Sequence, residues 1–272
     1  MIIFACEILS IRSELVSFLV NLNKSKSLEV LNAGGSLGDS FANVTTALID
    51  INLPLSEVSK VKNFYQGDIN LQSTWDKIPD KFFDFSICTH TLEDIRDPGF
   101  LITNLIRSSK AGFITVPNKY SEMSNIESIF WRGYCHHRWI FNFINNKFMA
   151  MAKFPPFSAQ PTKSSYFIFY FLKIMKKLSN RILPEKRLGY LPIRIKHKNP
   201  NFILQPGKIS HNIETSVIWI NDLDFAYVNN DFAGNNMENL IQIGNTFVNE
   251  KFDQRLQNLS LALEKLKGCL LK

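Results

Sequence analysis

Short apolar runs recur along the first 118 residues, and each of them ends on small or polar residues. The runs have the length of strands and lack the regular alternation of a strand with one face in water. Apolar strands that are separated by helices or loops predict a parallel α/β sheet covered on both faces. The expected strands lie within 28–39, 46–52, 61–70, 81–90 and 111–118.

The residues that end these strands are the most informative part of the sequence. Carboxyl ends of parallel strands meet at one edge of a sheet, and ligands of open α/β sheets bind at that edge. The residues gathered there are Asn32, Ala33, Gly34, Asp50, Asp68, Thr89, His90 and Asn118. A ligand-binding site is therefore predicted along this edge.

Helical spacing appears between and before these strands. Apolar residues recur in steps of three and four within Ser10–Asn23, and Pro98–Ser108 carries them on one side. The first twenty residues, MIIFACEILSIRSELVSFLV, are interpreted as an amphipathic helix, because two acids and an arginine interrupt the apolar residues.

After Asn118 the pattern changes, and the chain is divided at residue 150. Residues 1–150 are predicted to form the ligand-binding core, and residues 151–272 a C-terminal α+β extension packed on it. Leucines spaced by three and four predict a closing helix within Phe247–Leu271, and Thr215–Val228 is expected to form a hairpin turning at Asn221-Asp222. The segment 154–205 mixes prolines, lysines and aromatic residues and is left unassigned.

Charge and cysteine content bear on the class of protein. The 31 Lys and Arg against 24 Asp and Glu give a net charge of +7, which falls short of the clustered basic surface of a nucleic-acid-binding protein. Four scattered cysteines without a CxxC pair do not support a disulfide framework or a zinc site, so a cytoplasmic location is expected. The N-terminus lacks the basic start of a signal peptide.

The longest apolar run, YFIFYFL, is too short to cross a bilayer, which takes about 20 residues. Lysines follow this run, so that the segment 166–178 permits weak interfacial contact with a membrane, or a lid over a lipid-like or glycan substrate. A buried helix with a solvated lysine end is the preferred interpretation of the same pattern.

The ordered glycines and acids of Leu28–Asn118 resemble the class I S-adenosylmethionine-dependent methyltransferases. Val30–Gly38 stands where that family has a hydrophobic strand and a glycine loop. Asp50 stands at its ribose-binding acid, and Gly67-Asp68-Ile69 at its adenine-contacting turn. Phe83–Ile87 and His90–Ile95 are similar to its fourth strand and the segment after it. The resemblance implies a Rossmann-like methyltransferase fold, S-adenosylmethionine as cofactor, and methyl transfer to a small-molecule or glycan-like acceptor.

The resemblance also implies which residues hold the cofactor: Asn32, Gly34, Gly35, Ser36, Asp50, Ile51, Asp68, Ile69 and Thr89. Several of these residues also have an alternative role that needs no ligand. The glycines could form a plain turn, Asp50 could be a solvated strand end, and Asp68 could stabilise a turn. The sequence departs from the family at Asn32, which replaces an acid, and at Ser36, which replaces a glycine. In addition, 38–50 is too short for a helix and a return strand, so a loop is expected there.

Three histidines are candidates for catalytic groups. His90 ends the fourth expected strand, and His136 and His137 lie in an aromatic segment beside Arg138. A neutral imidazole can take a proton from a hydroxyl or amine acceptor, and an arginine can clamp a carboxylate or phosphate. The alternatives are a capping or packing role for His90 and a small aromatic core around His136 and His137. No metal site is predicted, because adjacent histidines on a strand point apart and the sequence places no third ligand.

Two further functions stay open. One is a catalytically inactive methyltransferase-like module for binding or scaffolding, which Asn32, Ser36 and the short connection motivate. The other is a dinucleotide-binding dehydrogenase. It is the weaker of the two, because the loop lacks GxGxxG and the acid follows the loop too soon.

Overall fold

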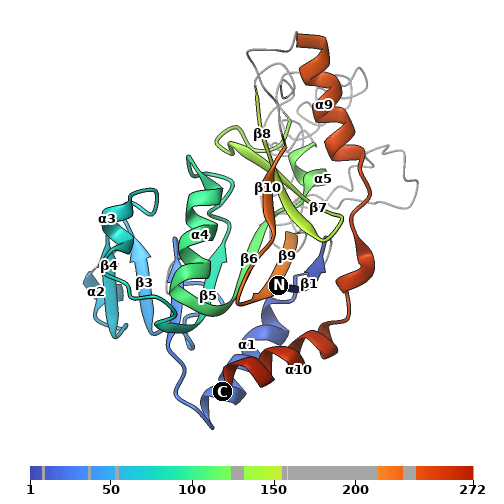
Figure 1. Ribbon diagram of the computed structural model, residues 1–272. Coiled ribbons are helices and arrows are strands. Elements are labelled where there is room, and N and C mark those ends of the chain that lie inside the picture. The colour runs from blue at the N-terminus through green and yellow to red at the C-terminus, as the bar shows by residue number, and fades with distance from the viewer. Residues whose placement is uncertain are drawn as a thin grey trace, which may run out of the picture.

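The computed structural model describes residues 1–7, 10–35, 38–52, 55–123, 132–154, 158, 214–228 and 237–271. Its main sheet has seven strands in the order β1-β9-β6-β5-β2-β3-β4 (Figure 1). The strands are Ile2–Cys6 (β1), Val30–Ala33 (β2), Ala47–Asp50 (β3), Asn63–Gln66 (β4), Phe83–Thr89 (β5), Ser109–Pro117 (β6) and Glu214–Ile220 (β9). The strands from β4 to β6 in this order run parallel, and β9 is antiparallel to both β6 and β1. The predicted Rossmann-like α/β class with a mostly parallel sheet is confirmed.

The strand order reverses its direction between β2 and β5. From β2 the chain steps outward through β3 to β4, and it then returns to place β5 on the other side of β2. A crevice opens at the carboxyl edge of an open sheet where the order reverses in this way. The register aligns Ala33 with Ile49 and Asp50 with Gln66, so the last residues of neighbouring strands reach this edge together.

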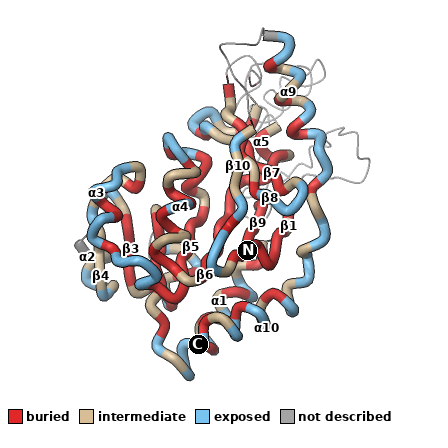
Figure 2. The backbone as a smooth tube through the Cα atoms, viewed as in Figure 1, coloured by how far each residue is buried: buried red, intermediate tan, exposed pale blue. Residues whose placement is uncertain are grey.

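Most residues of the main sheet's strands are buried (Figure 2), and apolar side chains cover both of its faces. Helices α1 (Arg12–Asn23) and α10 (Leu259–Leu270) pack on one face. Their contact includes Leu15, Leu19, Leu266, Phe85 and Phe113. Helix α4 (Pro98–Ser108) and a small second sheet pack on the other face, in a cluster that includes Leu101, Leu105, Ile49, Phe141 and Phe148.

The second sheet has three strands in the order β10-β8-β7. Strands β7 (Trp139–Ile144) and β8 (Lys147–Ala152) are antiparallel, and β10 (Phe225–Tyr227) joins β8 in parallel. Helix α9 (Met237–Asn249) packs on this sheet through a cluster that includes Ile140, Met151, Leu240 and Phe247. The extension therefore contributes β9 to the main sheet and β10 to the small one, and the expected division at residue 150 falls within β8.

Short elements connect these layers. They are α2 (Leu55–Val58), α3 (Gln72–Trp75), α5 (Lys119–Glu122) and the 3₁₀ turn η1 (Gln254–Leu256). Helix α4 begins where the sequence predicts, because Asp97 accepts a hydrogen bond from the backbone N–H of Phe100 and Pro98 occupies the first turn.

The connection between β2 and β3 contains no helix in residues 38–46, where 38–44 form turns. Phe41 and Val44 of these turns are buried in the cluster that α1 and α10 also share. The ring of Phe41 lies 5.6 Å from that of Phe113, measured between centroids. Two apolar side chains of a loop thus occupy a position on the sheet where a crossover helix would pack.

Three expectations about secondary structure are wrong. Residues 2–6 form strand β1 rather than the start of a helix, because both faces of the apolar IIFAC segment are covered. Thr215–Val228 is not a hairpin: β9 and β10 belong to different sheets, and Ile220 and Asp222 form only an isolated bridge. The closing helix is two helices, α9 and α10, because Lys251–Asp253 leave the helical path between them.

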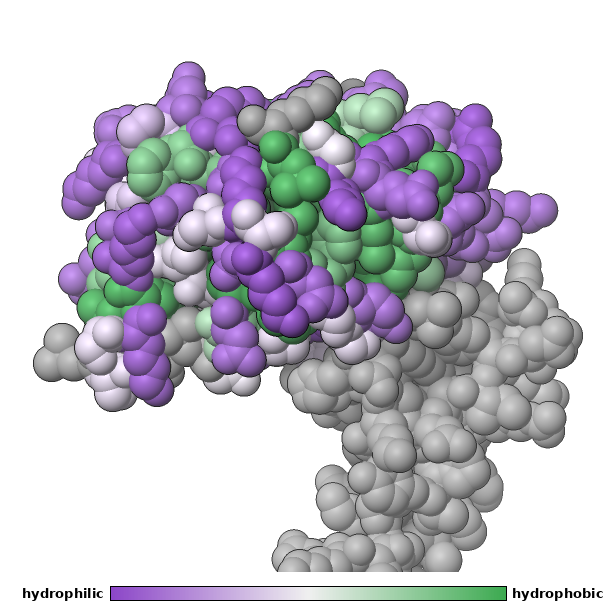
Figure 3. Space-filling model, turned by 90° about the horizontal axis from the view of Figure 1, so that it is seen from below, coloured by the Kyte–Doolittle hydropathy of each residue, from purple (hydrophilic) through white to green (hydrophobic). Residues whose placement is uncertain are grey.

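Figure 3 shows the face that carries α1 and α10, on which hydrophilic side chains surround a smaller hydrophobic area. None of the four cysteines, all of which lie among the described residues, forms a disulfide. Among the described residues no helix is long and apolar enough to cross a membrane. The segment 166–178, for which interfacial contact was considered, lies outside the described residues.

Candidate functional site

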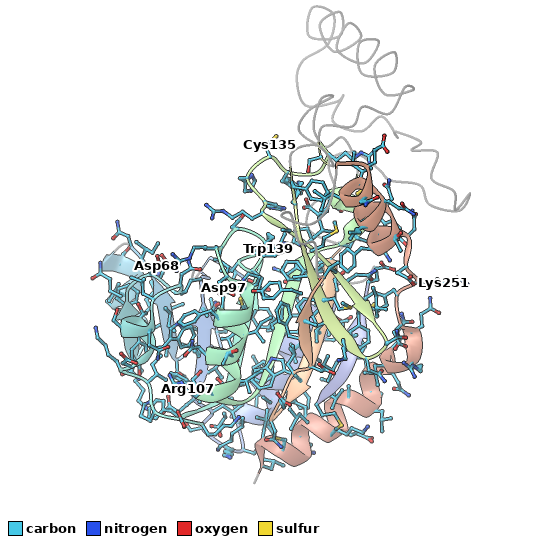
Figure 4. The ribbon with its side chains drawn as sticks, turned by 45° about the horizontal axis from the view of Figure 1, so that its top comes forward. Asp68, Asp97, Arg107, Cys135, Trp139 and Lys251 are labelled. Carbon is cyan, nitrogen blue, oxygen red and sulfur yellow. The ribbon has the colours of Figure 1, made fainter. Side chains whose placement is uncertain are left out.

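A cavity of about 470 Å³ opens at the carboxyl edge of the main sheet, beside the point where the strand order reverses. It is lined by Gly34, Asp50, Ile51, Asp68, Ile69, Asn70, His90, Thr91, Asp94, Ile95, Arg96 and Arg138. Seven of these residues are ones that the sequence singles out: Gly34, Asp50, Ile51, Asp68, Ile69, His90 and Arg138. In Figure 4, Asp68, Asp97 and Trp139 lie on this side of the sheet, and Arg107 lies at the far end of α4.

Gly34 brings bare backbone to the wall of the cavity. Its φ is +73°, a conformation that favours glycine, and an added Cβ would lie 2.5 Å from the side chain of Thr91. The N–H of Gly34 donates to the carbonyl of Ile49, and Thr91 Oγ1 donates to the carbonyl of Gly34. The glycine therefore lets the turn after β2 approach both β3 and the segment after β5.

Asn32 and Gly35 lie behind this wall rather than on it. Asn32 is fully buried, and its Nδ2 donates to Asp39 Oδ2 over 2.9 Å. A Cβ on Gly35 would lie 2.2 Å from Asn32 Oδ1, and that oxygen has no hydrogen-bond partner among the described residues. Asn32 thus supports the glycine turn from inside the sheet. Ser36 lies outside the described residues.

Two carboxylates line the cavity from the ends of β3 and β4. Asp50 Oδ1 accepts a hydrogen bond from the N–H of Asn52, and the neighbouring Ile51 is 63% exposed. Asp68 Oδ1 accepts from the backbone and side-chain nitrogens of Asn70. The bond from the backbone N–H of Asn70 contributes most, and the bond from its side chain next, to lowering the pKa of Asp68, so the carboxylate is charged. No hydrogen bond from a described residue reaches Asp68 Oδ2, which leaves that oxygen for a ligand.

Ile69 and Thr89 are held mainly by the protein itself. Ile69 is 7% exposed and packs in the cluster beneath α4, although it still lines the cavity. Thr89 is 8% exposed at the end of β5, and its carbonyl accepts from Thr91 Oγ1 over 3.1 Å. Thr89 itself does not line the cavity.

His90 lies between two buried carboxylates. Its Nδ1 is 3.2 Å from Glu93 Oε1, and its Nε2 is 3.0 Å from Glu214 Oε2. Burial alone lowers the pKa of His90, but the hydrogen bonds to Glu214 and Glu93 outweigh burial and raise the pKa to about 9. His90 is therefore a cation at neutral pH, and both of its nitrogens are occupied.

A wider network of charges holds His90 in place. Arg12 of α1 binds Glu214 through Nε and Nη2, and Nη2 also donates to Thr115 Oγ1 over 3.0 Å. Burial raises the pKa of Glu214, yet the bonds from His90 and Arg12 overcome it and leave that pKa lowered. His90 itself has a φ of +49°, which costs a residue with a Cβ about 1 kcal/mol. The surrounding contacts offset this cost.

His136 and His137 come together on a loop beside the cavity instead of on a strand. Their ring centroids are 4.5 Å apart, so the expectation that adjacent histidines point away from each other is wrong here. His136 Nε2 and His137 Nε2 each lie 3.9 Å from Asp94 Oδ1, and Asp94 lines the cavity. On its other side, His137 Nδ1 is 2.6 Å from Glu122 Oε1.

Several cavity residues were not predicted: Asn70, Thr91, Asp94, Ile95 and Arg96. Asn70 follows β4, and the other four follow β5. The family resemblance covers His90–Ile95 but assigns no ligand contact to Thr91, Asp94 or Ile95. The signal was present, because residues just after a strand that ends at this edge also reach the site. A larger hollow of about 680 Å³ lies along α9, and no predicted site residue lines it.

Among the comparisons with known proteins, only the one with solved structures finds similar chains. No family model and no curated protein matches the chain. An S-adenosylmethionine-dependent methyltransferase from Thermotoga maritima is 11% identical over 78% of this chain and 91% of that one, with a TM-score of 0.36. One from Archaeoglobus fulgidus is 14% identical over 76% and 93%, with a TM-score of 0.35.

The [4+2]-cyclase SpnF is 15% identical, with a TM-score of 0.29, over 38% of this chain and 44% of its own, so this chain spans less than half of that enzyme. With TM-scores under 0.5, none of the three structures bears on what this chain binds. The function is inferred from the cavity.

Proposed function

We propose that this protein is an S-adenosylmethionine-dependent methyltransferase that acts on a small-molecule or glycan-like acceptor. The observation that carries the proposal is that Gly34, Asp50 and Asp68 line one cavity at the carboxyl edge. They come from the ends of three adjacent strands, β2, β3 and β4. Their order along the chain is the one on which the sequence resemblance rests.

The residues of the cavity fit such a cofactor. Its volume of about 470 Å³ lies within the roughly 300–1,000 Å³ of small-molecule sites. Asp50 would accept from the ribose hydroxyls, and the free Oδ2 of Asp68 from the adenine amino group. Gly34 would give the methionine part access to bare backbone, because a Cβ there would collide with Thr91. The cofactor would supply a methyl group bound to a positively charged sulfur.

The acceptor is expected at the end of the cavity formed by Asp94 and Arg138. Arg138 suits a carboxylate or phosphate on the acceptor. His137 is the better candidate for a base, because Glu122 accepts the proton of Nδ1 and leaves a lone pair on Nε2. We assign His90 to the electrostatics of the site, since a doubly hydrogen-bonded cation does not take a further proton.

The departures from the family pattern predict modest cofactor affinity. The turns at 38–44 replace the helix whose N-terminus would otherwise face the ligand. Asn32 supplies no charge, although its Nδ2 holds the carboxylate of Asp39. Cofactor binding without turnover on a broad panel of acceptors would favour the inactive binding module instead.

Isothermal titration calorimetry with S-adenosylmethionine and S-adenosylhomocysteine tests the proposal. Asp50→Ala should weaken binding of both by about 1–3 kcal/mol, the cost of losing a charged hydrogen-bond acceptor. Asp80→Ala is the matched control, because Asp80 pairs with Arg107 away from the cavity and its side chain is 76% exposed. Absence of binding at millimolar concentration would refute the proposal, and equal affinity in both variants would remove Asp50 from the site.

A further inference from the structure

Three potential metal ligands converge beside the cavity. They are Oδ1 of Asp94, from the connection after β5, and Nε2 of His136 and of His137, from the loop before β7. Their ligand atoms all lie within 4.8 Å of one another, and they form the one group of this kind among the described residues. In Figure 4, Cys135 marks the loop that carries both histidines, at the top of the molecule above Trp139.

A buried carboxylate already orients one of these ligands. Glu122 Oε1 accepts from Nδ1 of His137 over 2.6 Å, and both side chains are less than 10% exposed. Lys153 fixes the other oxygen of Glu122 over 2.7 Å and donates to the carbonyl of Tyr134. Histidines that bind metals almost always donate their second ring nitrogen to such a carboxylate, which turns the lone pair of the first toward the ion.

The backbone of the loop is shaped for this contact. Gly133 has a φ of +65°, and an added Cβ would lie 2.7 Å from the backbone of Glu122 and 2.4 Å from its Oε2. Glycine is therefore needed for the loop to lie directly on α5. This close approach brings His137 to Glu122 and leaves the exposed side chains of His136 and Asp94 at the surface.

The donor set indicates which ions fit. Two imidazole nitrogens and one carboxylate oxygen suit first-row transition metals such as Zn²⁺, Fe²⁺ or Co²⁺ better than Mg²⁺ or Ca²⁺, which prefer oxygen. Ligand atoms around a tetrahedral zinc ion are about 3.4 Å apart, given bonds of about 2.0–2.2 Å. The 3.9 Å distances to Asp94 Oδ1 and the distance of at most 4.8 Å between the two Nε2 atoms must contract, and the exposed side chains of His136 and Asp94 can move to supply this.

We propose that Asp94, His136 and His137 bind a first-row divalent transition metal, with Glu122 as the positioning residue. Three protein ligands leave at least one coordination position open. Because Asp94 also lines the cavity, the ion would lie at the wall that we assign to the acceptor. It would then occupy Nε2 of His137, so that the ion would replace this histidine as the group that activates an acceptor hydroxyl. The metal site itself does not depend on methyl transfer.

Titration of tag-free, chelator-treated protein with Co²⁺ tests the site through its visible d–d absorption, followed by competition with Zn²⁺. We expect one tightly bound ion per chain. Asp94→Asn and His136→Ala should each weaken Co²⁺ binding at least tenfold, and both residues are exposed enough for the variants to fold. Glu122→Gln should weaken it about 10- to 100-fold with the same absorption spectrum, as expected for a residue outside the coordination sphere.

Asp80→Asn is the control and should bind Co²⁺ like the unmodified protein, because Asp80 lies outside this group and pairs with Arg107. Two results would overturn the site: no Co²⁺ absorption at all, or binding that Asp94→Asn and His136→Ala leave unchanged. The second would assign the ion to another part of the chain. Neither measurement involves S-adenosylmethionine, so failure of the metal site and failure of the proposed function remain distinguishable.

Discussion

Two histidines of this protein lie against buried carboxylates at the carboxyl edge of the sheet, yet their chemistry differs. His90 is bonded through both nitrogens, to Glu93 and to Glu214. His137 is bonded through Nδ1 to Glu122, and its Nε2 lies 3.9 Å from Asp94, beyond hydrogen-bond distance. The second nitrogen decides the outcome, because an imidazole with both nitrogens bonded to carboxylates is a structural cation, whereas a free lone pair can take a proton or a metal.

The surroundings of the two histidines explain this difference. His90 lies where α1, β6 and β9 meet, and Arg12 donates both to Glu214 and to Thr115 Oγ1. His137 lies on a loop, where Glu122 of α5 binds its Nδ1 and Lys153, which follows β8, holds Glu122, while the exposed Asp94 lies on the Nε2 side. Closed networks favour rigidity, and a site that is open on one side leaves room for a ligand.

The largest effect is expected at the carboxylate that closes the His90 network. Glu214→Ala should lower the free energy of unfolding by roughly 3–5 kcal/mol, because it leaves the partly buried charge of Arg12 without its carboxylate and His90 with Glu93 alone. Urea unfolding followed by circular dichroism measures this change. Glu14→Ala, at an exposed acid of the same helix as Arg12, should change it by less than about 0.5 kcal/mol. Similar losses of unfolding free energy in the two variants would show that the network around His90 does not stabilise the fold.

A smaller effect is expected in the pH dependence of stability. The pKa of His90 is about 9 in the folded protein and 6.5 by reference, so its contribution is fully present below pH 6.5. That contribution is lost as the pH rises toward 9, and it amounts to about 3 kcal/mol at most. His90→Gln should therefore remove a downward slope between pH 6.5 and 9.

Urea midpoints measured across this pH range for both proteins would show the difference. Parallel curves would mean that His90 has the same pKa in the folded and unfolded chain. Glu214 acts in the opposite direction, since its lowered pKa contributes stability that is lost as the pH falls through the folded pKa. The alkaline slope is thus not one that Glu214 can produce, and the difference between the two proteins isolates the part due to His90.

The sequence predicted the cavity side of the sheet better than the two histidine environments. Gly34, Asp50 and Asp68 were predictable because each lies at a strand end, and parallel strands bring their ends together. The partners of His90 were not predictable, because Glu214 lies 124 residues away in the sequence and reaches His90 only through the antiparallel strand β9. Residues 2–6 were misread because an edge strand covered on both faces has no period of two.

The histidine pair was misjudged for a local reason. A metal site was not expected because His136 and His137 would point apart on a strand, where neighbouring side chains alternate, but β7 begins only at Trp139. The loop before it turns at Gly133 and approaches Glu122. Glu122 and Asp94 are distant in sequence, and nothing in the residue spacing connects them to the histidines.

The smallest effects are expected when His136 and His137 are replaced one at a time. The free energy of unfolding is measured in the presence of a chelator, so that no bound ion contributes. His137→Ala should cost about 1–3 kcal/mol of unfolding free energy, because Glu122 is 1% exposed and loses its contact with His137 while Lys153 stays beside it. His136→Ala should cost less than about 0.5 kcal/mol, because its side chain is 61% exposed. Equal costs would show that Glu122 does not hold His137. Glu122 would then no longer distinguish the buried ligand from the exposed one, and the positioning role assigned to it would fail even if cobalt still bound.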